Sequence, residues 1–186
     1  MIPLLGMLTL TALGITALLA LTALVPPGRA ALGRVLDSSP RSPMVFAWFV
    51  ALVATLGSLY LSEIRQIEPC MLCWYQRIAM YPLVIVLGVA LLRRDGEVWK
   101  TALPLSLIGA CTSAYHIAVQ WIPSIEVTQC ATSAPCSLRY FVLYGWVTIP
   151  AMAGAAFFLI STLMVISALF AGAGREAPVE GSAGSD

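Results

Sequence analysis

Charged residues are scarce in this sequence. Only 10% of its 186 residues are Asp, Glu, Lys or Arg, whereas a soluble domain carries roughly 25%. Histidine occurs once, the net charge is +1, and 60% of the residues are hydrophobic, with a mean hydropathy of +0.90. This composition excludes a soluble globular domain and gives no reason to expect a nucleic-acid partner. The sequence therefore predicts an all-α integral membrane protein.

Basic residues are missing from the start of the chain, because no Lys or Arg precedes Arg29. A secretory signal peptide would place basic residues ahead of a short apolar core and end at a small-residue cleavage site. Instead, residues 2–25 form an uncharged run followed directly by Pro26 and Pro27. A membrane-spanning helix needs about 20 apolar residues. We therefore expect a retained transmembrane helix here.

Four further apolar runs are long enough to cross a membrane: 44–62, 74–92, about 101–121 and about 141–170. The last run is long, and Pro150 is expected to bend its first part. The expected organisation has three parts. Residues 1–43 form an N-terminal transmembrane helix and a cytoplasmic linker, residues 44–171 form a four-helix membrane domain, and residues 172–186 form a disordered cytoplasmic tail.

Basic residues are distributed unevenly among the connecting segments. Segment 26–43 holds three arginines and segment 93–100 holds two arginines and a lysine, whereas 62–69 and 122–140 hold one arginine each. Because basic loops stay in the cytoplasm, the first two segments are predicted to be cytoplasmic and the other two extracytoplasmic. Both groups of paired cysteines then lie on the side where disulfides form and persist.

The five cysteines divide into two pairs and one bystander. Cys70 and Cys73 precede one apolar run, Cys130 and Cys136 lie in a later loop, and Cys111 falls inside a span. A free cysteine in a span is most simply a small buried hydrophobic residue.

The Cys-x-x-Cys pair lies where a helix is predicted to begin. Pro69 suits a helix start because its missing N–H would have no partner there. Cys73 would then lie in the first turn, where the helix dipole stabilises a thiolate. Arg77 follows four residues later on the same face and is expected to add to that stabilisation.

Three interpretations of the four paired cysteines are possible. A four-cysteine zinc site is disfavoured because such sites usually occupy compact soluble modules. A purely structural bridge between Cys70 and Cys73 would close only a small loop and constrain little unfolded chain. Thiol–disulfide exchange between the two pairs is favoured.

Two motifs resemble the DsbB/BdbC family of quinone-dependent thiol oxidases. Residues 70–77, Cys-Met-Leu-Cys-Trp-Tyr-Gln-Arg, followed by Met-Tyr-Pro at 80–82, are similar to that family's signature. The later cysteine pair and residues 144–150 resemble its outer loop and the start of its last helix. The resemblance covers about residues 44–170 and implies a DsbB-type four-helix transmembrane bundle. The helix at 2–25 is an addition to it.

The resemblance also implies a function. A DsbA-like thioredoxin-fold thiol oxidase would attack the Cys130–Cys136 disulfide at Cys130. Electrons would pass through Cys136 and Cys70 to Cys73, and then to a membrane quinone, ubiquinone or menaquinone, beside Arg77. A monomer could contain this whole relay. The alternative is a non-catalytic membrane scaffold or assembly factor with two structural disulfides.

Three further residues are candidate quinone contacts. His116 lies within a predicted span, where an ionisable group is a functional candidate, and its surroundings resemble a family segment near the quinone. The alternative for His116 is a packing residue. Gln120 shares its helix face, and Trp74 neighbours the second cysteine of the motif.

Overall fold

The computed structural model describes residues 2–127, 130 and 134–173. Five helices in this part of the chain are long and apolar enough to cross a membrane. They are α1 (Ile2–Leu24), α3 (Ser42–Leu59), α4 (Met71–Arg93), α5 (Trp99–Trp121) and α6 (Ile149–Ala173). A π-helical turn, η1 (Tyr60–Ile64), extends α3. The predicted all-helical membrane protein with five spans is confirmed, and the predicted tail from 174 onward lies outside the described residues.

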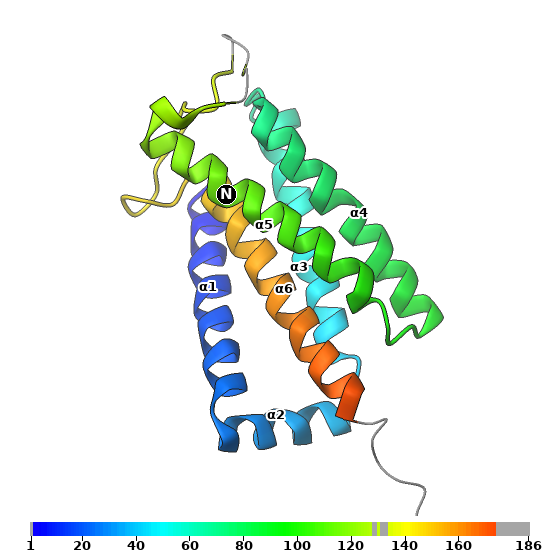
Figure 1. Cartoon of the computed structure of the whole chain (residues 1–186). Coiled ribbons are helices and arrows are strands. Elements are labelled where there is room, and N and C mark those ends of the chain that lie inside the picture. The colour runs from blue at the N-terminus through cyan, green and yellow to red at the C-terminus, as the bar shows by residue number, and fades with distance from the viewer. Residues whose placement is uncertain (1, 128–129, 131–133, 174–186) are drawn as a thin grey trace, which may run out of the picture.

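Helix α6 lies at the centre of the bundle and packs against α1, α3 and α5 (Figure 1). Small residues allow α5 and α6 to approach closely: a Cβ atom on Gly109 would overlap the ring of Phe157. The hydroxyls of Ser106 and Ser161 join the same two helices at 2.9 Å. Such close packing and interhelical hydrogen bonds hold helices together in lipid, where burial of apolar surface gives no driving force.

The segment predicted as a linker after α1 is mostly helical. Helix α2 (Pro26–Ser38) begins with two prolines, which are tolerated in a first turn, and runs across the lower ends of α1 and α6 in Figure 1. Gly28 lies close to Thr22, and a Cβ atom on Gly28 would overlap the carbonyl oxygen of Thr22. Arg29 and Arg34 are exposed. An amphipathic helix with exposed arginines across the ends of spans is suited to the membrane surface.

The last helix begins later than predicted. Helix α6 starts at Ile149 rather than near residue 141, and Pro150 occupies its first turn instead of bending its interior. The residues before it form a turn in which Leu143 and Val147 exchange backbone hydrogen bonds of 2.9 and 2.8 Å. This turn packs on the start of α1, because a Cβ on Gly6 would come within 2.8 Å of Leu143.

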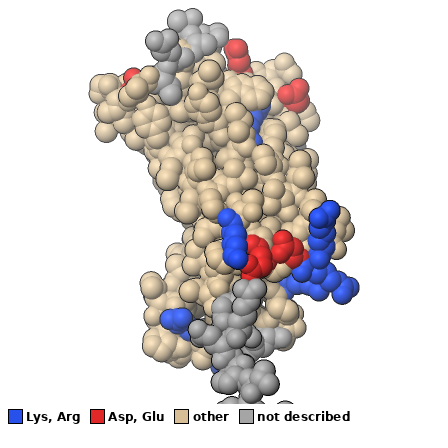
Figure 2. All heavy atoms as spheres, turned by 45° about the vertical axis from the view of Figure 1, so that its right-hand side comes forward, with Lys and Arg blue, Asp and Glu red and all other residues tan. Residues whose placement is uncertain are grey.

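The two ends of the bundle differ in what they carry. Helices α4 and α5 are antiparallel, so the cysteine-bearing start of α4 lies at the opposite end from the basic turn at 93–100. On the face shown in Figure 2, charged side chains gather near the ends with an uncharged band between them. A band of this kind fits a membrane-spanning protein.

Candidate redox site

The site begins at the N-terminus of α4. Cys70 is the residue that caps this helix, and its carbonyl accepts the first helical hydrogen bond, from Trp74 N–H at 3.1 Å. Cys73 is therefore the third residue of the helix, in the first turn as predicted. The free N–H groups and dipole of this turn favour negative charge on both sulfurs.

The structure brings the two cysteine pairs into one cluster. Cys130 and Cys136 form a disulfide with a Cα–Cα distance of 5.8 Å. Cys70 and Cys73 are free, and their Sγ atoms lie 3.1 Å apart. Both pairs pack around Val119 of α5. Pairs that lie close together can exchange by thiolate attack.

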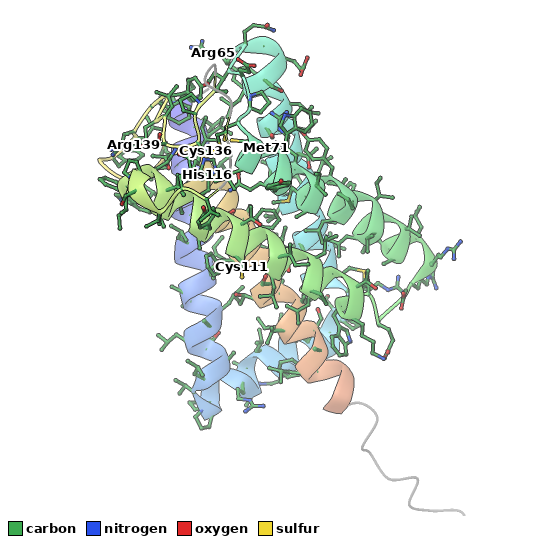
Figure 3. The ribbon with its side chains drawn as sticks, turned by 45° about the horizontal axis from the view of Figure 1, so that its top comes forward. Arg65, Met71, Cys111, His116, Cys136 and Arg139 are labelled. Carbon is green, nitrogen blue, oxygen red and sulfur yellow. A yellow bond between two sulfur atoms is a disulfide. The ribbon has the colours of Figure 1, made fainter. Side chains whose placement is uncertain are left out.

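Cys111 takes no part in this cluster. It lies lower on α5 in Figure 3, and its side chain is exposed on the bundle surface. The prediction of a buried Cys111 is wrong, because the sequence does not show which face of an apolar helix meets lipid rather than protein.

His116 lies beside Cys136 (Figure 3) and also contacts Cys70 of the inner pair. Its Nε2 is 3.1 Å from the carbonyl oxygen of Cys136 and 3.6 Å from Cys70 Sγ, and the side chain is only 2% exposed. Because a carbonyl only accepts, Nε2 carries the hydrogen in this contact. His116 therefore links the outer pair to the inner pair.

His116 and Gln120 face the cysteines from α5. The Gln120 side-chain N–H donates to the carbonyl of Leu138 at 3.3 Å. Both residues border a cavity of about 10 Å³ beside Cys70 and Cys73, which is too small for a quinone ring. Neither residue borders the larger groove described below, so the quinone contacts expected of His116 and Gln120 stay predictions.

In the reduced inner pair, the surroundings of Cys70 favour its thiolate form. The hydrogen bond with the Cys73 thiol is the largest influence, and it lowers the pKa of Cys70 to about 4 from the ordinary 9.0. Burial opposes this shift, and the His116 ring supports it. The sequence analysis placed the thiolate on Cys73, but the structure gives Cys70 the partners that hold a thiolate.

We expect Cys73→Ala to raise the pKa of Cys70 toward 9.0, because the substitution removes the sulfur 3.1 Å away whose contact lowers that pKa. Cys70 would then be mostly protonated at neutral pH, whereas Cys73→Ser keeps a hydroxyl donor and should shift the pKa less. Thiolate absorbance against pH, with the other three cysteines replaced by alanine, measures the change. A pKa still near 4 in Cys73→Ala would contradict this assignment.

A groove of about 520 Å³ opens on the other side of the inner pair. Its walls are mostly aliphatic and aromatic side chains from α1, α3, α4 and α6. Cys73 borders this groove, and Cys70 does not. Arg77 and Tyr81 follow Cys73 at intervals of four residues, so all three lie on one face of α4 and border the groove.

Arg77 is held in place by α3. Its Nε donates to the Ser58 hydroxyl at 3.0 Å and its Nη2 to the Ser58 carbonyl at 3.2 Å. The guanidinium also lies over the ring of Trp74, 5.3 Å from the ring centroid. Trp74 is 49% exposed and does not border the groove. Ser58 was missed by the sequence analysis, since nothing local in the chain pairs it with Arg77.

Tyr81 is a second residue whose possible role the sequence analysis missed. Its hydroxyl is buried, and it has no hydrogen-bond partner among the described residues. Tyr81 borders the groove, but because its hydroxyl oxygen is buried, the side chain forms part of the wall without exposing a donor. The spacing of four residues from Arg77 could have placed Tyr81 on the same face of the helix.

The cysteine cluster also contains atoms of the kind that ligate metal ions. Cys70, Cys73 and His116 each offer a ligand atom, and these atoms lie within 4.8 Å of one another. Cys130 and Cys136 are bonded to each other, so they offer no thiolates. The four-cysteine zinc site considered from the sequence therefore does not fit this structure.

Comparison with known proteins agrees with this geometry. The family model described as "Disulfide bond formation protein DsbB" matches residues 40–170. "Disulfide bond formation protein C" of Bacillus subtilis (strain 168) is 48% identical over 121 residues, which cover 64% of this chain and 88% of that protein. "Probable disulfide formation protein" of Coxiella burnetii (strain RSA 493 / Nine Mile phase I) is 42% identical over 126 residues, covering 67% and 86%. No solved structure matches.

Proposed function

Because the chain belongs to the DsbB family of disulfide bond formation proteins, we propose that it is a thiol:quinone oxidoreductase that reoxidises a DsbA-like thiol oxidase. The cysteine end of the bundle faces outward in this proposal, as the distribution of basic residues favours. One observation carries it: Cys70 faces the outer pair across His116, whereas Cys73 borders the large groove. The inner pair thus joins the outer disulfide to a membrane-facing site, and a single bundle contains the whole path.

The outer disulfide receives the first attack. Cys130 is partly exposed, whereas Cys136 is fully buried at 0% exposure, so a thiolate of the thioredoxin-fold partner can reach Cys130. The bond from Cys130 to Cys136 breaks, and Cys136 leaves as a thiolate. The partner's second thiol then resolves the mixed disulfide. The partner leaves oxidised, and Cys130 and Cys136 are left reduced.

Transfer to the inner pair follows the same chemistry. The Cys136 thiolate attacks Cys70 of an oxidised inner pair, Cys73 leaves, and Cys130 closes the outer disulfide again. His116 lies against both Cys136 and Cys70 and holds the two residues near each other.

The groove fits a quinone. Its volume of about 520 Å³ lies within the range of small-molecule sites, roughly 300–1,000 Å³. Its apolar walls suit an isoprenoid tail. Arg77, one helical turn from Cys73, supplies donors for a quinone oxygen there.

A bound quinone would accept two electrons and two protons and leave as the quinol. One proton comes from the Cys73 thiol and the other from water, since Cys70 has already lost its own. Cys70 and Cys73, whose Sγ atoms lie 3.1 Å apart, would lose these two electrons and become joined by a disulfide bond. Arg77 stabilises negative charge at the groove, the preorganised electrostatic help that contributes most to catalysis.

We expect Cys136→Ser to trap a mixed disulfide between Cys130 and the oxidised form of a DsbA-like partner, because the Cys130 thiolate attacks the partner's disulfide and the Cys136 thiol that would resolve the product is absent. Non-reducing electrophoresis followed by mass spectrometry of the linked peptides identifies the cysteine. Cys111→Ser, which changes an exposed thiol outside the cluster, is the control and should trap nothing. A link through Cys70, or none at all, would contradict the proposed order.

A further inference from the structure

Helix α1 forms one wall of the groove that Cys73 borders. It precedes residues 40–170, the part of the chain that matches the family model. Side chains from its outer half nevertheless border the groove together with those of α3, α4 and α6. The α1 residues are Leu5, Leu8, Thr9, Thr11, Ala12 and Ile15.

The position of α1 is fixed at both ends. The turn at Leu143 packs on Gly6 at the outer end, and α2 packs against α1 at the other end. Along its length α1 rests on α6. Thr9, on the side turned into the bundle, is buried, with its hydroxyl bonded to the Leu5 carbonyl at 2.9 Å. This part of α1 is therefore a fixed wall.

The groove opens to lipid between α1 and α3. Leu5 of α1 approaches Gly57 of α3, because a Cβ on that glycine would lie 3.3 Å from Leu5 Cδ2. Elsewhere, among the described residues, these two helices make no extensive contact. Leu8 and Phe49 border the groove from opposite helices and are 43% and 54% exposed. An opening lined by such residues admits an apolar chain from the membrane.

We propose that α1 and α3 together hold the isoprenoid tail of the quinone whose head lies beside Cys73 and Arg77. This inference rests on the proposed function. The α3 part of the wall from Phe46 to Ser58 spans roughly 18 Å at 1.5 Å per residue, far longer than a quinone ring requires. Only a long apolar chain occupies a groove of that length with so few polar groups. Helix α1 thereby gives this protein a preference for quinones with long tails.

The expected contribution is moderate for a physical reason. A tail that leaves lipid for the groove exchanges one apolar environment for another, so the hydrophobic effect adds little. What α1 adds is close van der Waals contact over many atoms. Blocking that contact should weaken binding about tenfold, the change that corresponds to about 1.4 kcal/mol.

Ala12→Phe tests the proposal in the full-length protein. Ala12 borders the groove, so a phenyl ring there fills the space of the tail. Ala17→Phe is the matched control, since Ala17 is exposed on the same helix and does not border the groove. Quenching of tryptophan fluorescence gives the affinity for a polyprenyl quinone and for its tailless counterpart. The amount of polyprenyl quinone that stays bound through purification is a second readout.

The expected result is about tenfold weaker binding of the polyprenyl quinone by Ala12→Phe, with binding of the tailless quinone unchanged and Ala17→Phe like the wild type. Unchanged binding of the polyprenyl quinone by Ala12→Phe, or an equal loss for both quinones, would overturn the role of α1. Val53→Phe alters the α3 wall of the groove. It distinguishes a failure of the proposed role of α1 from a failure of the proposed quinone site. If only Val53→Phe weakens binding of the polyprenyl quinone, α1 does not hold the tail, and the proposed function stands. If the wild type binds neither quinone, both the role of α1 and the proposed function are wrong.

Discussion

Replacing Cys73 by serine is expected to abolish quinone-dependent thiol oxidation, lowering turnover at least about a thousandfold, to the background rate. A hydroxyl cannot form a disulfide with Cys70, so the inner pair can no longer be oxidised and reduced. The Cys130–Cys136 disulfide does not depend on Cys73 and should still exchange with a reduced thioredoxin-fold partner. Quinone absorbance measures turnover, and maleimide tagging followed by mass spectrometry reports the state of each pair.

Two comparisons make this result specific. Cys111→Ser removes an exposed thiol on the same bundle and should leave turnover at the wild-type rate. Cys73→Ser should bind quinone, since the groove keeps Arg77, Tyr81 and its apolar walls. Turnover by Cys73→Ser near the wild-type rate would show that the inner pair is structural, as a scaffold would require.

Arg77→Ala is expected to lower turnover about a hundredfold, the usual effect of removing one donor that stabilises developing charge. Arg77 is the positively charged side chain that borders the groove beside Cys73, and its guanidinium stays protonated at any physiological pH. Arg77→Lys should recover only part of the activity, because an ammonium cannot donate to both Ser58 oxygens and face the groove in the same planar arrangement. The measurement is turnover against quinone concentration for both variants.

Ser58→Ala is the matched control for Arg77. It removes the 3.0 Å hydrogen bond to the Ser58 hydroxyl but leaves the 3.2 Å bond to the backbone carbonyl. Arg77 would remain near the groove with less restraint, so the loss should be several-fold rather than a hundredfold. Wild-type kinetics in Arg77→Ala would remove Arg77 from the reaction, and equal losses in Ser58→Ala and Arg77→Ala would point to a packing role.

The features that the sequence predicted well are those with a local physical cause. Five apolar runs of sufficient length predicted the five spans, because a bilayer fixes the length of the helix that crosses it. The start of α4 at Cys70 followed from Pro69 and the change from polar to apolar residues. The pairing of cysteines at one end of the bundle followed from the number of crossings between them.

The features that could not be predicted from the sequence depend on which face of each helix meets which neighbour. In a span almost every residue is apolar, so periodicity does not separate the lipid-facing side from the packed side. For that reason the sequence did not predict that Cys111 is exposed, or that His116 faces the cysteines and not the groove. Helix α2 lies in the segment predicted as a linker, and its two prolines fit the first turn of a helix.

The contact that holds Arg77 shows the same limit. Ser58 lies on α3, and no sequence spacing connects it with a residue of α4. The thiolate on Cys70 likewise depends on His116 of α5 and on the thiol 3.1 Å away. Local sequence placed both residues at a helix start but could not decide between two sulfurs in the same turn.

The central claim is that electrons pass from a thioredoxin-fold dithiol through both cysteine pairs to quinone. It is tested most directly by anaerobic turnover of the full-length protein in lipid vesicles that contain polyprenyl quinone, with a reduced DsbA-like protein supplied outside. The account predicts equal amounts of quinol and oxidised partner, formed by the wild type and not by Cys73→Ser. Oxidation of the partner without matching quinol, or equal quinol from Cys73→Ser, would contradict it.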